Sequence, residues 1–246
     1  MGHSDSKLPA PQLSPESAQR GLPTTIQAAY KKSWKEVVIY LREPDKEPTF
    51  CLSLPGGWYD KAILHDGPEP KHPVLATSTG EGKWRNDFAV TLPAMPGTDM
   101  EPSREILRYK VGRREIYWFA IKVGQDQHIE RFEWRHSHGA EVKSVGESKR
   151  GWKLVRLGGG TQDPSEDTTQ GPDRADGLTS DGKEIVAVWA DSGDWKSMSK
   201  IGTLNLRGSG ATGELGTTWA LMALMSRMCI WQKEMQVATT TTVASA

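Results

Sequence analysis

Two histidines and a glutamate near the middle of the chain have the residue types of a metal site. His136 and His138 are separated by one residue, and Glu141 follows three residues after the second histidine. Alternate side chains of a β-strand point to the same face, so a strand here would present both imidazoles together. Imidazole and carboxylate are ligands that divalent metals take. The three residues are therefore candidate ligands of a metal-dependent enzyme. The favoured interpretation is that the histidines end an inward-facing strand and hydrogen-bond to the backbone, without a metal.

A second candidate site is basic. Between residues 104 and 157 the chain has 13 basic and seven acidic residues, a local excess of six positive charges. Arg113 and Arg114 fall at the predicted turn of a hairpin, and Lys149, Arg150 and Lys153 fall at the start of a later strand. Each Lys or Arg near an anionic membrane contributes about 1 kcal/mol to binding. These five residues are the predicted binding site for an anionic head group; a solvated outer face is the alternative.

Other motifs of catalytic or cofactor sites are incomplete. Gly208, Gly210 and Gly213 match G-x-G-x-x-G, but a dinucleotide-binding unit also needs a parallel strand after its helix, and the chain ends instead. The sequence has no Gly-x-Ser-x-Gly motif. Cys51 and Cys229 fall in a predicted strand and a predicted buried helix, where thiols are unreactive. We therefore predict no catalytic residue and no cofactor.

Composition narrows the class of protein. The 246 residues include 31 basic and 31 acidic side chains, and this neutral balance argues against nucleic-acid binding by bulk positive charge. The longest apolar run, residues 219–225, is far shorter than the roughly 20 residues of a transmembrane helix. The N-terminal residues lack the apolar core of a signal peptide. With only two cysteines, both expected to be free, we predict a cytoplasmic protein, with a nuclear location also open.

Short segments with strand character, separated by Gly, Pro and Asp turns, make up most of the chain. In one of them, residues 128–137, Phe132 and Trp134 are expected to face inward, with Arg131, Glu133 and Arg135 on the outer face. Such a series is typical of an antiparallel sandwich or barrel. The eleven predicted strands are 37–42, 50–54, 62–66, 74–78, 87–92, 105–111, 115–123, 128–137, 151–157, 184–191 and 200–207.

One segment, residues 213–236, predicts the only long helix. Its apolar residues surround the whole circumference, which indicates a helix buried on all sides. The predicted fold is therefore mainly β, an antiparallel closed barrel of about 11–12 strands around one central hydrophobic C-terminal helix. The domain is expected to span 33–236. Disordered tails are expected at 1–32 and 237–246, and an acidic disordered loop at 158–182.

The order of these elements resembles the tubby C-terminal-like superfamily, which includes tubby domains, LURP-one-related proteins and phospholipid scramblases. The resemblance covers roughly residues 33–236 and depends on the segment GELGTTWALMALMSRMCIWQKEM lying last. The segments FEWRHSHG, RGWKLVRL and EIVAVWA are similar to those of uncharacterised fungal proteins of like size. The resemblance implies a closed barrel threaded by a hydrophobic helix. It also implies phosphoinositide binding through basic surface residues, as in tubby domains.

Three functions follow as hypotheses. The first is a non-catalytic intracellular binding or adaptor module that recognises anionic phospholipid head groups through the five basic residues. The second is a metal-dependent, cupin-like enzyme that uses His136, His138 and Glu141, and the third is a protein-interaction scaffold. A lipocalin-like carrier is not favoured, because the helix would fill the barrel. The expected partners are a membrane surface or a protein, not nucleic acid, and the chain is expected to be a monomer.

Overall fold

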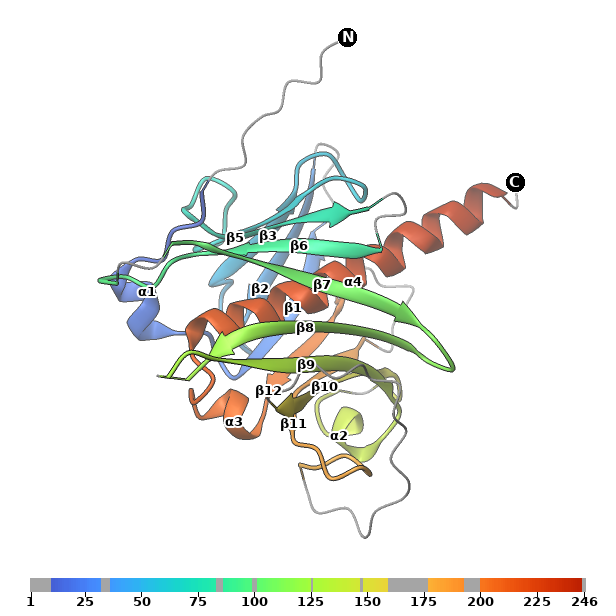
Figure 1. The fold of residues 1–246 in the computed structure, drawn as a ribbon. Helices are drawn as coiled ribbons and strands as arrows, with labels where there is room; N and C mark the ends of the chain where they lie inside the picture. The colour runs from blue at the N-terminus through green and yellow to red at the C-terminus, as the bar shows by residue number, and fades with distance from the viewer. Residues whose placement is uncertain are drawn as a thin grey trace.

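Twelve antiparallel strands form a closed barrel in the part of the chain that the structure describes (Figure 1). This computed structural model describes residues 10–31, 36–82, 86–98, 101–124, 126–146, 148–158, 177–192 and 200–244. Each strand pairs with its neighbours along the chain, and β1 closes the barrel by pairing with both β2 and β12. The predicted fold class is confirmed.

All eleven predicted strands are present, and each begins within two residues of its predicted start. The strand predictions are correct because short apolar runs between turn residues are a strong strand signal. The twelve strands are β1 (Thr25–Lys31), β2 (Val37–Arg42), β3 (Phe50–Leu54), β4 (Ala62–His65), β5 (Val74–Glu81), β6 (Asp87–Leu92), β7 (Ser103–Val111), β8 (Glu115–Val123), β9 (His128–Ser137), β10 (Gly151–Gly158), β11 (Ile185–Asp191) and β12 (Gly202–Leu206).

Strand β1 corrects the expectation of a disordered tail over residues 1–32. Ile26 and Ala28 are buried in the main core, and the strand completes the barrel. Its alternation of a few small or apolar residues is a weak sequence signal, whereas the unpaired edges of β2 and β12 strongly favour a strand between them. Residues 1–9 lie outside the described part of the chain.

A short helix, α1 (Pro15–Arg20), precedes β1 within the same predicted tail. Ser14 caps it, because its hydroxyl accepts a hydrogen bond from the backbone N–H of Ser17 at 3.0 Å. Ser17 and Arg20 both bind the carboxylate of Asp66, which follows β4. These contacts attach the N-terminal segment to one end of the barrel.

Helix α4 (Thr217–Ala244) runs through the ring of strands and extends past it at its C-terminal end (Figure 1). All residues from 219 to 230 are buried, and they share one core with the inward side chains of the strands. Phe132 on β9 packs against Phe119 and Trp219, and the indole N–H of Trp134 donates to the Ser226 hydroxyl at 2.8 Å. No helix among the described residues is long and apolar enough to cross a membrane.

The helix boundaries differ from the prediction of 213–236. Gly213 and Gly216 have φ values of 81° and 85°, so the chain turns there and α4 begins at Thr217. A separate four-residue helix, α3 (Gly208–Ala211), precedes this turn. At its other end α4 continues to Ala244, through most of the segment that was expected to be a disordered tail. Tyr59 supports this continuation by donating to the backbone carbonyl of Gln236 at 3.3 Å.

The antiparallel order gives the barrel two distinct ends. One end holds α1, α3 and the start of α4, together with the end of β8 and the start of β9, and we call it the entry end. The exit end is the one where α4 leaves the barrel, and it holds the β7–β8 hairpin, the end of β9 and the start of β10.

The outer face of β9 is less exposed than its polar sequence indicates. Phe132 and Trp134 face the core as expected, but the outward residues Arg131 and Glu133 are also buried. The Arg131 guanidinium lies 3.9 Å from the ring centroid of Trp118 on β8, a cation–π contact. Beside it, Arg135 binds Glu133 at 2.6 Å and Asp181 at 3.2 Å.

The short helix α2 (Ala140–Lys143) covers another part of the barrel's outer surface. Val142 packs there with Ile185, Val188 and Ala190 of β11 in a second small core. Residues 159–176 of the predicted acidic loop lie outside the described part of the chain.

Candidate functional site

Four of the five predicted binding residues lie at the exit end of the barrel. Arg113 and Arg114 form the turn between β7 and β8, and Lys149 and Arg150 immediately precede β10. The register pairs β8 and β10 with the two sides of β9, through Ile116↔Arg135 and Gly151↔Ser137. Two strand spacings, about 10 Å, therefore separate the start of β8 from the start of β10. All four side chains are exposed, and we call them the exit-rim cations.

Lys153, the fifth predicted residue, has a different environment. It lies on β10, where its ammonium forms an ion pair with Glu141 at 3.3 Å, and both side chains are mostly buried. Glu141 also accepts a hydrogen bond from the Ser137 hydroxyl at 2.6 Å. Burial by itself would raise the pKa of Glu141, but the hydrogen bonds it accepts and Lys153 outweigh this effect and lower the pKa. The charge of Lys153 is therefore neutralised locally.

The three candidate metal ligands do not form a metal centre. His136 packs against Trp152, with ring centroids 3.5 Å apart and ring planes tilted by 32°, and its Nε2 lies 3.4 Å from Glu115. His138 is exposed, while Glu141 is bound by Ser137 and Lys153 as described. Within the described ranges there is no group of three or more His, Cys, Asp or Glu residues that could hold a metal ion.

The motifs that the sequence analysis set aside have structural roles. Both cysteines are free and buried, as predicted, and burial raises the pKa of Cys51 and of Cys229 to about 12. The thiols are therefore protonated and unreactive near neutral pH. In the glycine-rich segment, the backbone N–H of Ser209 donates to the carboxylate of Glu184 at 2.7 Å. A protein carboxylate thus occupies the position where a phosphate would need to bind.

An ion cluster around a buried arginine at the exit end was not predicted. Arg227 on α4 is 0% exposed, and its Nη2 lies 3.2 Å from a carboxylate oxygen of both Asp191 and Glu234. Its guanidinium lies over the rings of Trp189 and Trp152, at 4.7 and 5.8 Å from their centroids. The sequence signal for this cluster was a single arginine inside an apolar helix, because a buried cation requires a partner of opposite charge.

The two tryptophans complete this cluster. The indole N–H of Trp189 donates to Asp191 at 2.7 Å, and that of Trp152 donates to Glu234 at 3.1 Å. Each carboxylate thus accepts from both a guanidinium and an indole. The cluster connects β10, β11 and α4 at the exit end of the barrel.

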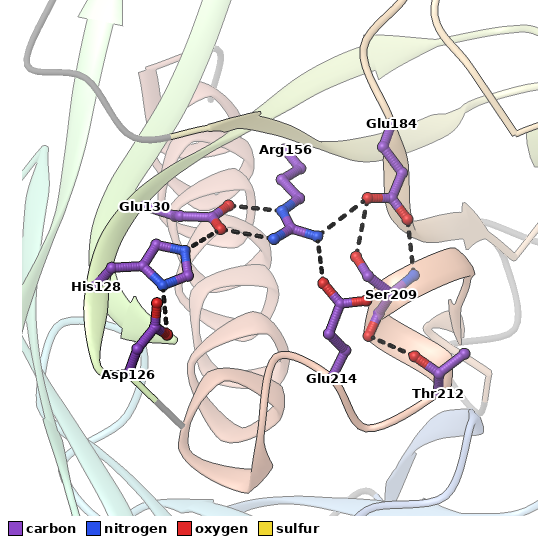
Figure 2. Close-up of polar contacts among 8 residues, drawn as sticks. All are labelled: Asp126, His128, Glu130, Arg156, Glu184, Ser209, Thr212 and Glu214. Carbon is purple, nitrogen blue, oxygen red and sulfur yellow. Dashed lines mark hydrogen bonds and ion pairs between the residues drawn. The ribbon is translucent and has the colours of Figure 1, made fainter. Parts of the chain in front are cut away.

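The polar network drawn in Figure 2 lies at the entry end and was also not predicted. Arg156 on β10 binds Glu130 on β9 through two bonds of 2.6 Å, and it also contacts Glu214 at 2.9 Å and Glu184 at 3.5 Å (Figure 2). The bidentate bond from Arg156 lowers the pKa of Glu130, and Glu130 in turn raises the pKa of Arg156. The strand alternation that places Phe132 inward also places Glu130 inward, and this inward carboxylate was the sequence signal for a buried ion pair.

Glu184 and His128 extend this network in two directions. Glu184 accepts from both the backbone N–H and the hydroxyl of Ser209, at 2.7 and 2.9 Å, and so connects the network to α3. On the other side, the ring nitrogens of His128 lie 2.5 Å from Glu130 and 2.7 Å from Asp126. The network therefore joins the β8–β9 turn to the segment that leads into the central helix.

Comparisons of the chain with protein-family models, with curated proteins and with solved structures give no match. The architecture is consistent with a tubby-like fold, since a closed barrel of twelve antiparallel strands packs against a long C-terminal helix.

Proposed function

We propose that this protein is a non-catalytic binding module that recognises anionic phospholipid head groups through the exit-rim cations. The observation that carries the proposal is that two segments more than 30 residues apart in the sequence bring four exposed cations to the same end of the barrel. Lys153 is left out of the proposed site because Glu141 already neutralises it. The two free thiols fit our proposal that the module acts at the cytoplasmic face of a membrane.

The filled interior supports binding at the surface. Residues 219–230 of α4 are buried among the inward side chains of the strands, so the lumen of the barrel is occupied by protein. A ligand of the proposed kind must therefore bind outside the lumen. Exposed arginine and lysine side chains at a rim suit a head group that is presented by a flat membrane.

Apolar side chains at the same end give further support. Val111 in the β7–β8 hairpin, Tyr59 in the β3–β4 connection and Val237 on α4 are among the large hydrophobic residues with exposed side chains. Cations beside apolar side chains are typical of surfaces that lie in the interface of a bilayer. Val111 lies in the same hairpin as Arg113 and Arg114, and this combination of apolar and cationic side chains favours an anionic membrane over a soluble phosphate.

We also propose that the chain is a tubby-like domain. The support is the architecture: a closed antiparallel barrel with the long hydrophobic helix last in the chain. The sequence contains no residue-by-residue match to a tubby phosphoinositide motif. The proposed function therefore depends on the exit-rim cations of this chain rather than on the family.

Vesicle co-sedimentation tests the proposal. The full chain is mixed with vesicles of phosphatidylcholine alone, or with vesicles that also contain phosphatidylserine or a phosphoinositide. We expect sedimentation only with the anionic vesicles, and we expect it to weaken as salt is added, because exposed charges are screened. Inorganic phosphate and a soluble inositol phosphate serve as competitors, to separate recognition of the free head group from recognition of the membrane.

Charge-reversal variants identify the binding surface. The test variant is Arg113→Glu/Arg114→Glu/Lys149→Glu, and the matched control reverses three exposed cations at the entry end, Lys46→Glu/Lys71→Glu/Lys183→Glu. We expect the first variant to lose binding and the second to keep it. Equal loss in both would indicate nonspecific charge attraction, and no binding by the unmodified protein would refute the proposal.

A further inference from the structure

His128 lies between two carboxylates at the entry end of the barrel (Figure 2). Its Nδ1 is 2.7 Å from Asp126 and its Nε2 is 2.5 Å from Glu130. A neutral imidazole has one N–H and can donate to only one acceptor, whereas an imidazolium has two. With both carboxylates ionised, only the protonated ring satisfies both contacts.

We propose that His128 is a proton-dependent clasp that holds the β8–β9 turn to the polar network at the entry of the central helix. The proposal is independent of the lipid-binding function. Asp126 belongs to the turn, and Glu130 lies on β9 with its side chain only 4% exposed. The ring of His128 thus joins an exposed carboxylate on the turn to a buried carboxylate inside the barrel.

The clasp is connected to the start of the helix through Arg156. Glu130 accepts two bonds of 2.6 Å from Arg156, and Arg156 also contacts Glu214 in the segment between α3 and α4. Glu184, the next partner of Arg156, holds Ser209 of α3. The contacts therefore run from the turn, through β9 and β10, to the segment that precedes α4.

The charges around His128 favour its protonated form. The groups that face it or its partners are Asp126 on the turn, Glu130 on β9, Arg156 on β10, Glu184 beside β11 and Glu214 before α4. With the ring protonated, these four carboxylates and two cations leave an excess of two negative charges. Loss of the proton removes one hydrogen bond and increases that excess to three.

The direction of the pH response follows from these contacts. The hydrogen bonds to Asp126 and then to Glu130 raise the pKa of His128 above its ordinary value. A group whose pKa is raised in the folded state stabilises that state fully below the pKa of the unfolded chain. The stabilisation is lost as pH increases through the pKa of the folded state. The clasp is therefore closed at pH values below the raised pKa of His128 and opens as the pH increases through that pKa.

An NMR titration of the unmodified chain tests the clasp directly. The Cε1–H resonance of His128 is followed from about pH 5 to about pH 9, around the ordinary histidine pKa of about 6.5. It is assigned through its connection to the sequentially assigned backbone of His128 in the unmodified chain. We expect its midpoint to lie above that ordinary value, with backbone resonances of the β8–β9 turn shifting at the same midpoint. A midpoint at or below the ordinary value would overturn the proposal, and this result requires no variant to fold.

Thermal unfolding of variants tests what the clasp holds. We expect the melting temperature of the unmodified protein to fall across the His128 midpoint, and we expect His128→Asn to lose that fall. The control is His138→Asn, an exposed histidine at the exit end, which should keep the pH dependence. An unchanged pH dependence in His128→Asn would refute a structural role for the proton.

Discussion

Replacing Arg156 with methionine should destabilise the barrel more than any exposed ion pair would. The substitution keeps a long apolar stem but removes the guanidinium that donates two bonds of 2.6 Å to Glu130. The Glu130 side chain is 4% exposed and that of Arg156 is 22% exposed, so the carboxylate that remains is almost fully buried. His128 still donates to it, but its strongest partner is gone.

The magnitude follows from the cost of an unpaired buried charge. Breaking a buried ion pair by removing one partner costs about 3 to 5 kcal/mol. Because His128 remains and Arg156 is partly exposed, we expect the lower limit, about 3 kcal/mol of unfolding free energy. For a chain of this size that loss lowers the melting temperature by about 6 to 12 °C.

Calorimetry and urea unfolding of four proteins measure this cost. They are the unmodified chain, Arg156→Met, Glu130→Gln and the double variant. Since the double variant no longer buries an unpaired charge, it should recover part of the loss, and the cycle should give a coupling of about 2 kcal/mol. The control is Arg104→Met, which breaks an exposed pair with Glu81 and should cost no more than about 1 kcal/mol. A cost of Arg156→Met no larger than that of the control, or additive single changes, would refute the reasoning.

Two further predictions concern the barrel itself. Leu224→Ala removes a side chain that is 1% exposed inside the barrel, and we expect it to cost about 3 to 5 kcal/mol in urea unfolding, against less than 1 kcal/mol for Val237→Ala on the exposed part of the same helix. Similar costs for the two would contradict a helix packed within the strands. Removal of residues 1–31 deletes β1 and leaves β2 and β12 as open edges, so we expect aggregation or loss of cooperative melting; removal of residues 1–9 is the control. A soluble, cooperatively melting protein without residues 1–31 would show that the barrel does not need β1.

The sequence was most informative where one local pattern was strong. The strands from β2 to β12 combine apolar or aromatic residues with Gly, Pro or Asp turns, and each was predicted within two residues of its start. The helix was recognised because its apolar residues surround the circumference, which is stable only inside other structure. The two glycines that delay its start, Gly213 and Gly216, act through positive φ values that composition alone did not locate.

The site residues were harder to predict because the role of each side chain depends on the partner it contacts in the folded chain. Arg113, Arg114, Lys149 and Arg150 were identified from local charge, but Lys153 belongs to the same charged segment and is neutralised by Glu141 on a different element. In the same way, the spacing of His136 and His138 predicted a shared strand face, yet His136 packs against Trp152 and His138 lies beyond the end of β9. Residue type indicated chemistry, and the neighbours decided whether that chemistry was available.

The sequence by itself determined the fold class, the number of strands to within one, the buried central helix and the free, buried cysteines, because each follows from local periodicity and residue type. Only the tertiary structure decided that β1 closes the barrel, since the open edges of β2 and β12 arise from pairing across the whole chain. It also decided the partners of Glu130, Arg156 and Arg227. Buried charges are stable only when opposite charges and hydrogen-bond donors meet them, and those partners come from strands and helices distant in the sequence.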